Sequence, residues 1–103
     1  MEYRKLPHGG EKISIIGLGN SSLGPAGEAE IERIVRLAIE NGVNYFDMAA
    51  SDAVPFPAYG RAVAGCRENV YFQIHFGADY RSGKYGWTLN LDTIKRSVDW
   101  QLK

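Results

Sequence analysis

Segments with the pattern of β-strands alternate with segments with the pattern of helices, and this order restricts the fold of the chain more than any other feature. Apolar residues recur at helical spacing over 28–41, where Gly42 follows as a stop signal, and again over 91–103. Short aromatic and β-branched runs at 43–48 and 70–76 predict strands. Strands separated by helices are typical of a parallel α/β sheet with crossover connections.

Both predicted helices carry further signals at their ends. The apolar stripe of the first consists of Ile31, Ile34, Val35, Ala38 and Ile39. Its first turn is acidic, as the helix dipole favours. The last helix follows Asn90, a residue type that caps helix N-termini well.

The start of the chain has the pattern of a β-hairpin. Strand-prone runs at 3–6 and 12–16 flank a loop rich in turn-forming residues. Ile15 and Ile16 then lead into Gly17-Leu18-Gly19, which predicts a buried strand that enters a tight loop.

Two further segments are expected to be irregular. Pro55 and Pro57 indicate a loop over 53–58 that leads into a short helix at 59–64. Residues 78–90 mix glycines with aromatic residues and show no regular period, so they are expected to form a loop.

Composition predicts a soluble, globular chain and argues against several classes of function. Twelve basic and twelve acidic side chains give no net charge, so nothing favours nucleic acid or an anionic membrane as partner. Cys66 is the single cysteine, so an intramolecular disulfide is excluded and a metal site is not expected. The N-terminus lacks the apolar stretch of a signal peptide, and no run reaches the roughly 18 to 20 apolar residues of a membrane span. We therefore expect a cytoplasmic protein.

The glycine-rich stretch 17–24 suggests a dinucleotide-binding loop of the Rossmann type, but its spacing is wrong. The third glycine of the G-x-G-x-x-G pattern falls on Ser22, and Pro25 and Gly27 delay the next helix. The position of Asp47 is compatible with a ribose-binding acid. The failed glycine spacing nevertheless argues against a Rossmann fold.

Five segments are similar to the N-terminal part of the aldo-keto reductases. They are Glu2-Tyr3-Arg4-Lys5-Leu6, Ile16-Gly17-Leu18-Gly19, the run from Ala38 to Ala49, Gly60-Arg61-Ala62-Val63 and Ile94-Lys95-Arg96-Ser97-Val98. The resemblance extends over essentially the whole chain, and Asn41-Gly42-Val43-Asn44-Tyr45-Phe46-Asp47 is its most specific part. It implies a (β/α)8 TIM barrel with an opening hairpin that plugs the barrel bottom. Such a barrel needs roughly 250 residues, so 1–103 are expected to be an incomplete domain that holds its first three β/α units.

The resemblance also implies an oxidoreductase that binds NADP(H) without a Rossmann fold and acts on carbonyl or alcohol groups. The chemistry of the family uses an Asp, a Tyr, a Lys and a His, and the Tyr donates a proton to the carbonyl oxygen. Asp47 stands at the position of the Asp, but Asp52 replaces the Tyr and His75 replaces the Lys. The His belongs to a fourth strand. Gly19 and Asn20, with Asp47, are expected to line the nicotinamide side of the cofactor site.

Several functional interpretations follow from these replacements. In the first, His75 near Asp47 and Asp52 acts as a cation or acid, because imidazole titrates near neutral pH. In the second, the barrel binds the cofactor without reductase activity. In the third, an incomplete sheet with an uncovered face associates with copies of itself.

Structural roles compete with these interpretations at single residues. His75 is also compatible with a hydrogen-bonded structural residue at the end of a strand. Asp52 is compatible with a solvated turn residue. Tyr59 aligns with a helix that follows the active-site loop, which favours a structural residue over a relocated acid. The aromatic residues Tyr80, Tyr85 and Trp87 could form a substrate wall or pack against the remainder of a barrel.

Overall fold

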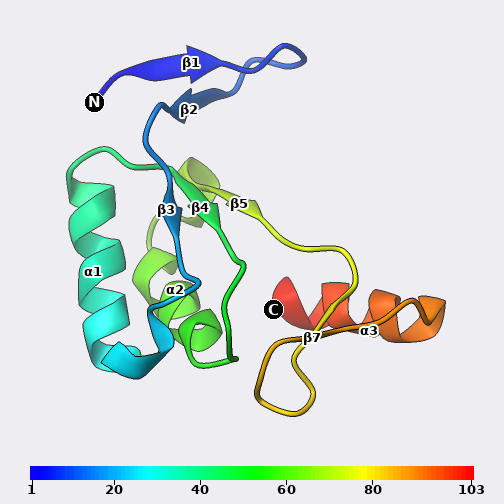
Figure 1. The fold of residues 1–103 in the computed structure, drawn as a ribbon. Helices are drawn as coiled ribbons and strands as arrows, with labels where there is room; N and C mark the ends of the chain where they lie inside the picture. Colours follow the sequence, from blue (N-terminus) through cyan, green and yellow to red (C-terminus); the bar gives the residue numbers. More distant parts are fainter.

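The computed structural model describes all residues, 1–103, as a mixed α/β structure (Figure 1). Its elements are β1 (Tyr3–Lys5), β2 (Lys12–Ser14), β3 (Leu18–Gly19), η1 (Gly24–Ala26), α1 (Glu28–Glu40), β4 (Tyr45–Asp47), α2 (Pro55–Val63), η2 (Arg67–Asn69), β5 (Tyr71–Gln73), β6 (Ala78–Asp79), β7 (Gly86–Trp87) and α3 (Leu91–Gln101). The predicted order of hairpin, strands and helices is confirmed.

The central sheet has three parallel strands in the order β3-β4-β5, as the alternating pattern predicts. In its register Phe46 lies opposite Leu18 on one side and Phe72 on the other. The sheet is open, so these residues alone do not close a barrel.

Helices α1 and α2 cover one face of the sheet, and the main core lies between them and the strands. Phe46 is fully buried at its centre. Its ring centroid is 5.7 Å from that of Tyr59 on α2, in an edge-to-face arrangement, and 5.6 Å from that of Phe72. Because side chains alternate along a strand, Tyr45 and Asp47 project from the opposite face, which no helix covers.

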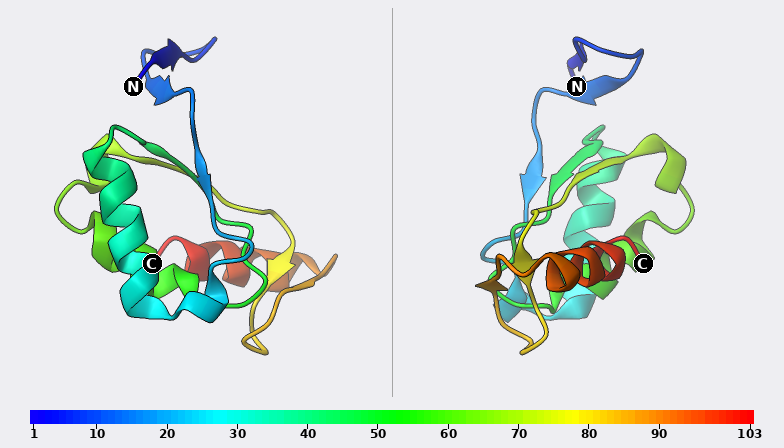
Figure 2. Two further views of the ribbon diagram at one scale, coloured as in Figure 1. Left: turned by 60° about the vertical axis from the view of Figure 1, so that its left-hand side comes forward. Right: turned by 90° about the vertical axis from the view of Figure 1, so that its right-hand side faces the viewer.

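The hairpin β1–β2 stands at the amino end of the sheet, far from α3 (Figure 2). The hydroxyl of Tyr3 donates to the carbonyl of Gly42 at 2.8 Å. Asn44 accepts from the Ser14 amide at 2.8 Å and donates to the Lys12 carbonyl at 2.9 Å. These bonds attach the hairpin to the turn between α1 and β4.

Ile15 and Ile16 were predicted to lie in a buried strand, and this prediction is wrong. Their side chains are 49% and 58% exposed, and pairing with the sheet begins only at Leu18. The two residues lie in the link between β2, which ends at Ser14, and β3, which begins at Leu18.

Two other boundaries differ from expectation. Helix α2 begins at Pro55, not at Tyr59, because the first turn of a helix needs no amide donors and so accepts proline. Residues 78–90 contain the short antiparallel pair β6–β7, with Ala78 opposite Trp87. Strands of two residues are too short to produce a recognisable period.

Helix α3 has the predicted N-cap, since the side chain of Asn90 accepts from the Thr93 amide at 3.0 Å. The helix lies beyond the carboxyl end of the sheet, where Trp100 packs against Phe56 and Tyr80. None of the three α-helices has the length and apolar character that crossing a membrane requires.

Candidate functional site

A close side-chain contact between Asp47 and His75 marks the carboxyl end of the sheet. The Nε2 atom of His75 lies 2.6 Å from Oδ1 of Asp47. Asp47 ends β4 and pairs in register with Gln73, the last residue of β5. His75 follows two residues later, so alternation returns its side chain to the face that carries Asp47.

This pair remains open to solvent and can take part in proton transfer. The side chains of His75 and Asp47 are 39% and 38% exposed. A hydrogen bond between imidazole and carboxylate fixes the orientation of the ring. Nδ1 of His75 makes no hydrogen bond, which leaves one ring nitrogen available for a bound molecule.

Asp52 belongs to a different set of contacts. Its Oδ1 accepts from the amide of Val54 at 2.9 Å, and its backbone forms a bridge with Lys84. The carboxylate also fills the space beside Gly24, where an added Cβ would lie 2.3 Å from Oδ2. The structure thus joins His75 to Asp47 and gives Asp52 neither a hydrogen bond nor an ion pair with them.

Gly19 and Asn20 lie at the same end of the sheet as Asp47. Gly19 pairs with Asp47 in register, and a Cβ on Gly19 would meet no atom within 4 Å, so the backbone is accessible there. Asn20 is 1% exposed, and its Nδ2 donates to Sδ of Met48 at 3.4 Å. Its Oδ1 is buried without a partner. A buried amide oxygen with no donor is costly, so this position suits a ligand that supplies an N–H or O–H.

Tyr59 lies on the helix-covered side of the sheet and not with Asp47. Its ring packs against Phe46, and its buried hydroxyl has no partner. Burial raises the pKa of Tyr59 well above its usual value, which makes the phenol a poorer proton donor. These contacts support the structural interpretation of Tyr59.

The predicted aromatic group after the third strand divides into a buried and an exposed part. Tyr80 is 5% exposed, and its hydroxyl donates to the Ala50 carbonyl at 2.7 Å. Burial, with smaller contributions from Tyr85 and Asp52, raises the pKa of Tyr80 to about 12. Trp87 is 70% exposed, and Tyr85 is 53% exposed. Tyr80 is thus part of a second small core, while Trp87 remains on the surface.

Neither an acidic cluster nor the cysteine forms a metal centre. No three His, Cys, Asp or Glu side chains come together in a way that could hold a metal ion. Cys66 is half-buried and unpaired.

Comparison with known proteins gives a structural likeness only. No protein-family model matches the chain, and neither does any curated protein. Two solved structures, both described as a candidate aldo-keto reductase from Pseudomonas aeruginosa, superpose with TM-scores of 0.77 and 0.74 at 24% sequence identity. Each match covers 97% of this chain and 40% of the solved chain. The chain therefore has the fold of one part of those proteins and spans less than half of their length.

Proposed function

We propose that residues 1–103 are the N-terminal part of an NADP(H)-dependent oxidoreductase of aldo-keto reductase type, in which His75 takes the acid–base role. The 2.6 Å contact between Nε2 of His75 and Oδ1 of Asp47 carries this proposal. The pair lies at the carboxyl ends of parallel strands, where α/β barrels place their catalytic groups. The structural likeness supports the fold on which the proposal depends.

The two side chains have separate tasks in this mechanism. Asp47 accepts the Nε2–H of His75 and orients the ring. Nδ1–H of His75 donates its proton to the oxygen of a carbonyl substrate. The same nitrogen takes the proton back when an alcohol is oxidised. A nicotinamide cofactor, when bound, supplies or accepts the hydride.

Gly19, Asn20 and Asp47 would hold the nicotinamide side of the cofactor. The unpartnered Oδ1 of Asn20 fits the N–H groups of a carboxamide. The absence of a side chain at Gly19 allows a flat ring to approach the backbone beside Asp47.

A second function, cofactor binding without reductase activity, is favoured by the surroundings of Asp52. This residue stands where the family has its Tyr, yet it bonds to Val54 within its own loop. A site without the phenol retains the features that would bind the cofactor and has only His75 to supply a proton.

Titration of NADPH fluorescence and steady-state oxidation of NADPH with a panel of aldehydes and ketones separate the two functions. Both use the full-length protein that contains this chain. We expect binding and turnover, and we expect His75→Ala to lower kcat by about 10² to 10⁴-fold with little change in NADPH affinity. His8→Ala, in the exposed hairpin loop, is the matched control and should retain activity. Binding without turnover would establish the second function, and absence of NADPH binding would contradict both.

A further inference from the structure

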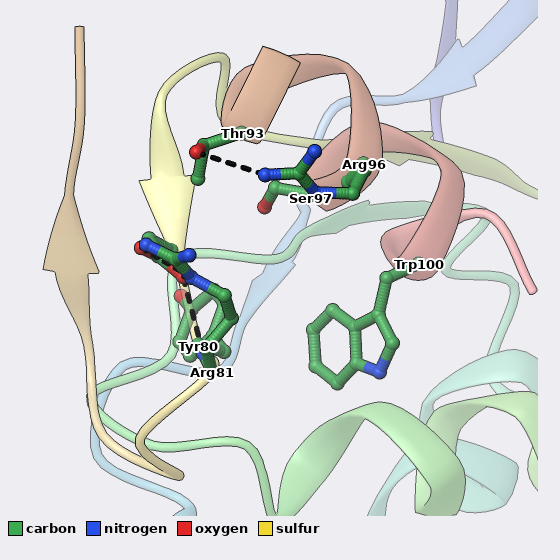
Figure 3. A pocket seen from close by; sticks show the side chains of 7 residues that line it. Tyr80, Arg81, Thr93, Arg96, Ser97 and Trp100 are labelled. Atoms are coloured by element: carbon green, nitrogen blue, oxygen red, sulfur yellow. Dashed lines mark hydrogen bonds and ion pairs between the residues drawn. The ribbon is translucent and has the colours of Figure 1, made fainter. Parts of the chain in front are cut away.

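A separate pocket lies between the turn after β6 and one side of α3 (Figure 3). Its volume is about 360 Å³, within the roughly 300 to 1,000 Å³ of small-molecule sites. Its walls include Asp79, Tyr80, Arg81, Thr93, Arg96 and Trp100. Neither Asp47 nor His75 lines it, so it is distinct from the site proposed above.

The pocket has an excess of positive charge. Arg81 holds Asp79 through a forked contact, with Nη2 to Oδ2 at 2.7 Å and Nε to Oδ1 at 3.0 Å. The bonds from Arg81 hold the pKa of Asp79 below its usual value, so this pair is neutral overall. Arg96 forms no ion pair of its own, although its charge also lowers the pKa of Asp79, so the pocket holds two arginines and one carboxylate.

Thr93 supplies a second, buried donor at the same point. Thr93 is 6% exposed, and its Oγ1 accepts a hydrogen bond from Nη2 of Arg96 at 3.3 Å. The hydroxyl hydrogen of Thr93 has no acceptor. A guanidinium has five N–H donors, and Arg96 uses one of them within the protein. Free donors of both side chains therefore lie together, as an oxyanion requires.

Trp100, one helical turn after Arg96 on α3, adds an aromatic surface to the pocket wall. The indole of Trp100 is held by Phe56, at 4.8 Å between ring centroids, and by Tyr80, at 5.7 Å. Trp100 nevertheless remains 42% exposed. Figure 3 shows Thr93 and Arg96 on one side of the open space and Trp100 on another. A flat ring can stack on an indole that its neighbours already hold in place.

The geometry points to a binding site for a small aromatic anion, with a carboxylate or phosphate group on Arg96 and Thr93 and the ring against Trp100. The planar guanidinium suits both oxyanions, because each can accept two parallel N–H bonds. The ring adds apolar contact that inorganic ions cannot provide.

Fluorescence and calorimetric titrations with phenyl phosphate and benzoate test this site on the 103-residue chain. Trp87→Phe leaves Trp100 as the single tryptophan reporter. We expect saturable quenching by at least one of the two probes, and the stronger one identifies the preferred oxyanion. Arg96→Gln should weaken binding by about tenfold or more. Lys95→Gln, exposed on the same helix and outside the pocket, removes the same charge and should change the affinity less than twofold.

Three outcomes would overturn the proposal. The first is an equal loss of affinity in Arg96→Gln and Lys95→Gln. The second is no saturation by phenyl phosphate or benzoate at millimolar concentration. The third is neutral benzyl alcohol that binds as tightly as these anions. Inorganic phosphate that binds as tightly as phenyl phosphate would overturn the role of Trp100. Circular dichroism establishes that each variant is folded. If Arg96→Gln is not, Arg96→Lys keeps the charge without the fork and should still weaken binding.

Discussion

His75 and Asp47 meet because strand register and side-chain alternation act together. Asp47 lies opposite Gln73, and the next residue on the same face is His75, which extends beyond the last paired position. Its ring therefore reaches back to the carboxylate of the neighbouring strand. A shift of one residue in β5 would turn His75 toward the helices and separate the two groups.

Gly42 shows how one residue attaches the hairpin to the sheet. Its φ of +89° is unfavourable for side chains, and an added Cβ would lie 2.8 Å from Cβ of Met1 and 2.9 Å from the hydroxyl of Tyr3. The same hydroxyl donates to the carbonyl of Gly42. Glycine is thus required both by the backbone conformation and by the close approach of the hairpin.

We expect Gly42→Ala to lower the free energy of unfolding by about 1 to 2 kcal/mol or more, because strain and steric conflict add. Gly60→Ala is the matched control. Gly60 lies inside α2, and an added Cβ would meet no atom within 4 Å, so stability should rise by about 0.5 to 1 kcal/mol. Urea unfolding followed by circular dichroism measures both. Equal effects of the two substitutions would contradict this role of Gly42.

Helices α1 and α2 are joined by exposed ion pairs in addition to their apolar contact. Glu32 on α1 bonds Arg36 of its own helix at 2.7 Å and Arg61 of α2 at 3.0 Å. Arg61 also reaches Glu28 at 3.2 Å. Hydrogen bonds from Arg36 and then Arg61 hold the pKa of Glu32 below its usual value.

This lowered pKa predicts the direction of a pH effect. The ionised carboxylate of Glu32 stabilises the folded state above the unfolded-state pKa of about 4.3. The contribution is lost as the pH falls through the lower folded-state value. We expect Glu32→Gln to have a lower Tm than the parent chain at neutral pH. The difference should shrink as the pH falls through the folded-state pKa of Glu32, because the glutamate is then protonated in both states. Thermal unfolding at several pH values measures this, and a difference that stays constant would contradict it.

The whole molecule is a partial fold with an uncovered sheet face. The helices α1 and α2 cover one side of the sheet, and the likeness to solved structures extends over 40% of their length. Large apolar residues remain exposed beyond the carboxyl end of the sheet: Phe76 is 78% exposed, Trp87 70% and Leu89 84%. Apolar groups of this size are typical of surfaces that contact another protein or another part of the same protein.

We expect the isolated 103-residue chain to associate with a second copy through the surface formed by Phe76, Trp87 and Leu89. Light scattering coupled to gel filtration should give a mass above 11.4 kDa that rises with concentration. Leu89→Glu should shift the chain toward the monomer, whereas Leu37→Glu, at an exposed position on α1, should not. A constant monomer mass together with cooperative unfolding would contradict this association.

Local signals were sufficient for α1 and α3 and for the order of the sheet strands. The predicted helix over 28–41 agrees with α1 to within one residue, and Asn90 caps α3 as expected. Periodicity, capping and stop signals act within one or two turns of chain, so they can be read directly from the residues.

Other features depended on contacts between distant residues. The start of α2 at Pro55, the pair β6–β7 and the exposure of Ile16 have no local signal of sufficient length. At the candidate site, the resemblance to the aldo-keto reductases predicted that His75 lies near Asp47 and Asp52. The register of two strands decided that these two residues touch, and the packing of a loop kept Asp52 in other contacts. Sequence alone thus determined α1, α3 and the order of the sheet strands, because those depend on neighbouring residues. The tertiary structure decided which side chains form a site, because that depends on the positions of separate elements in space.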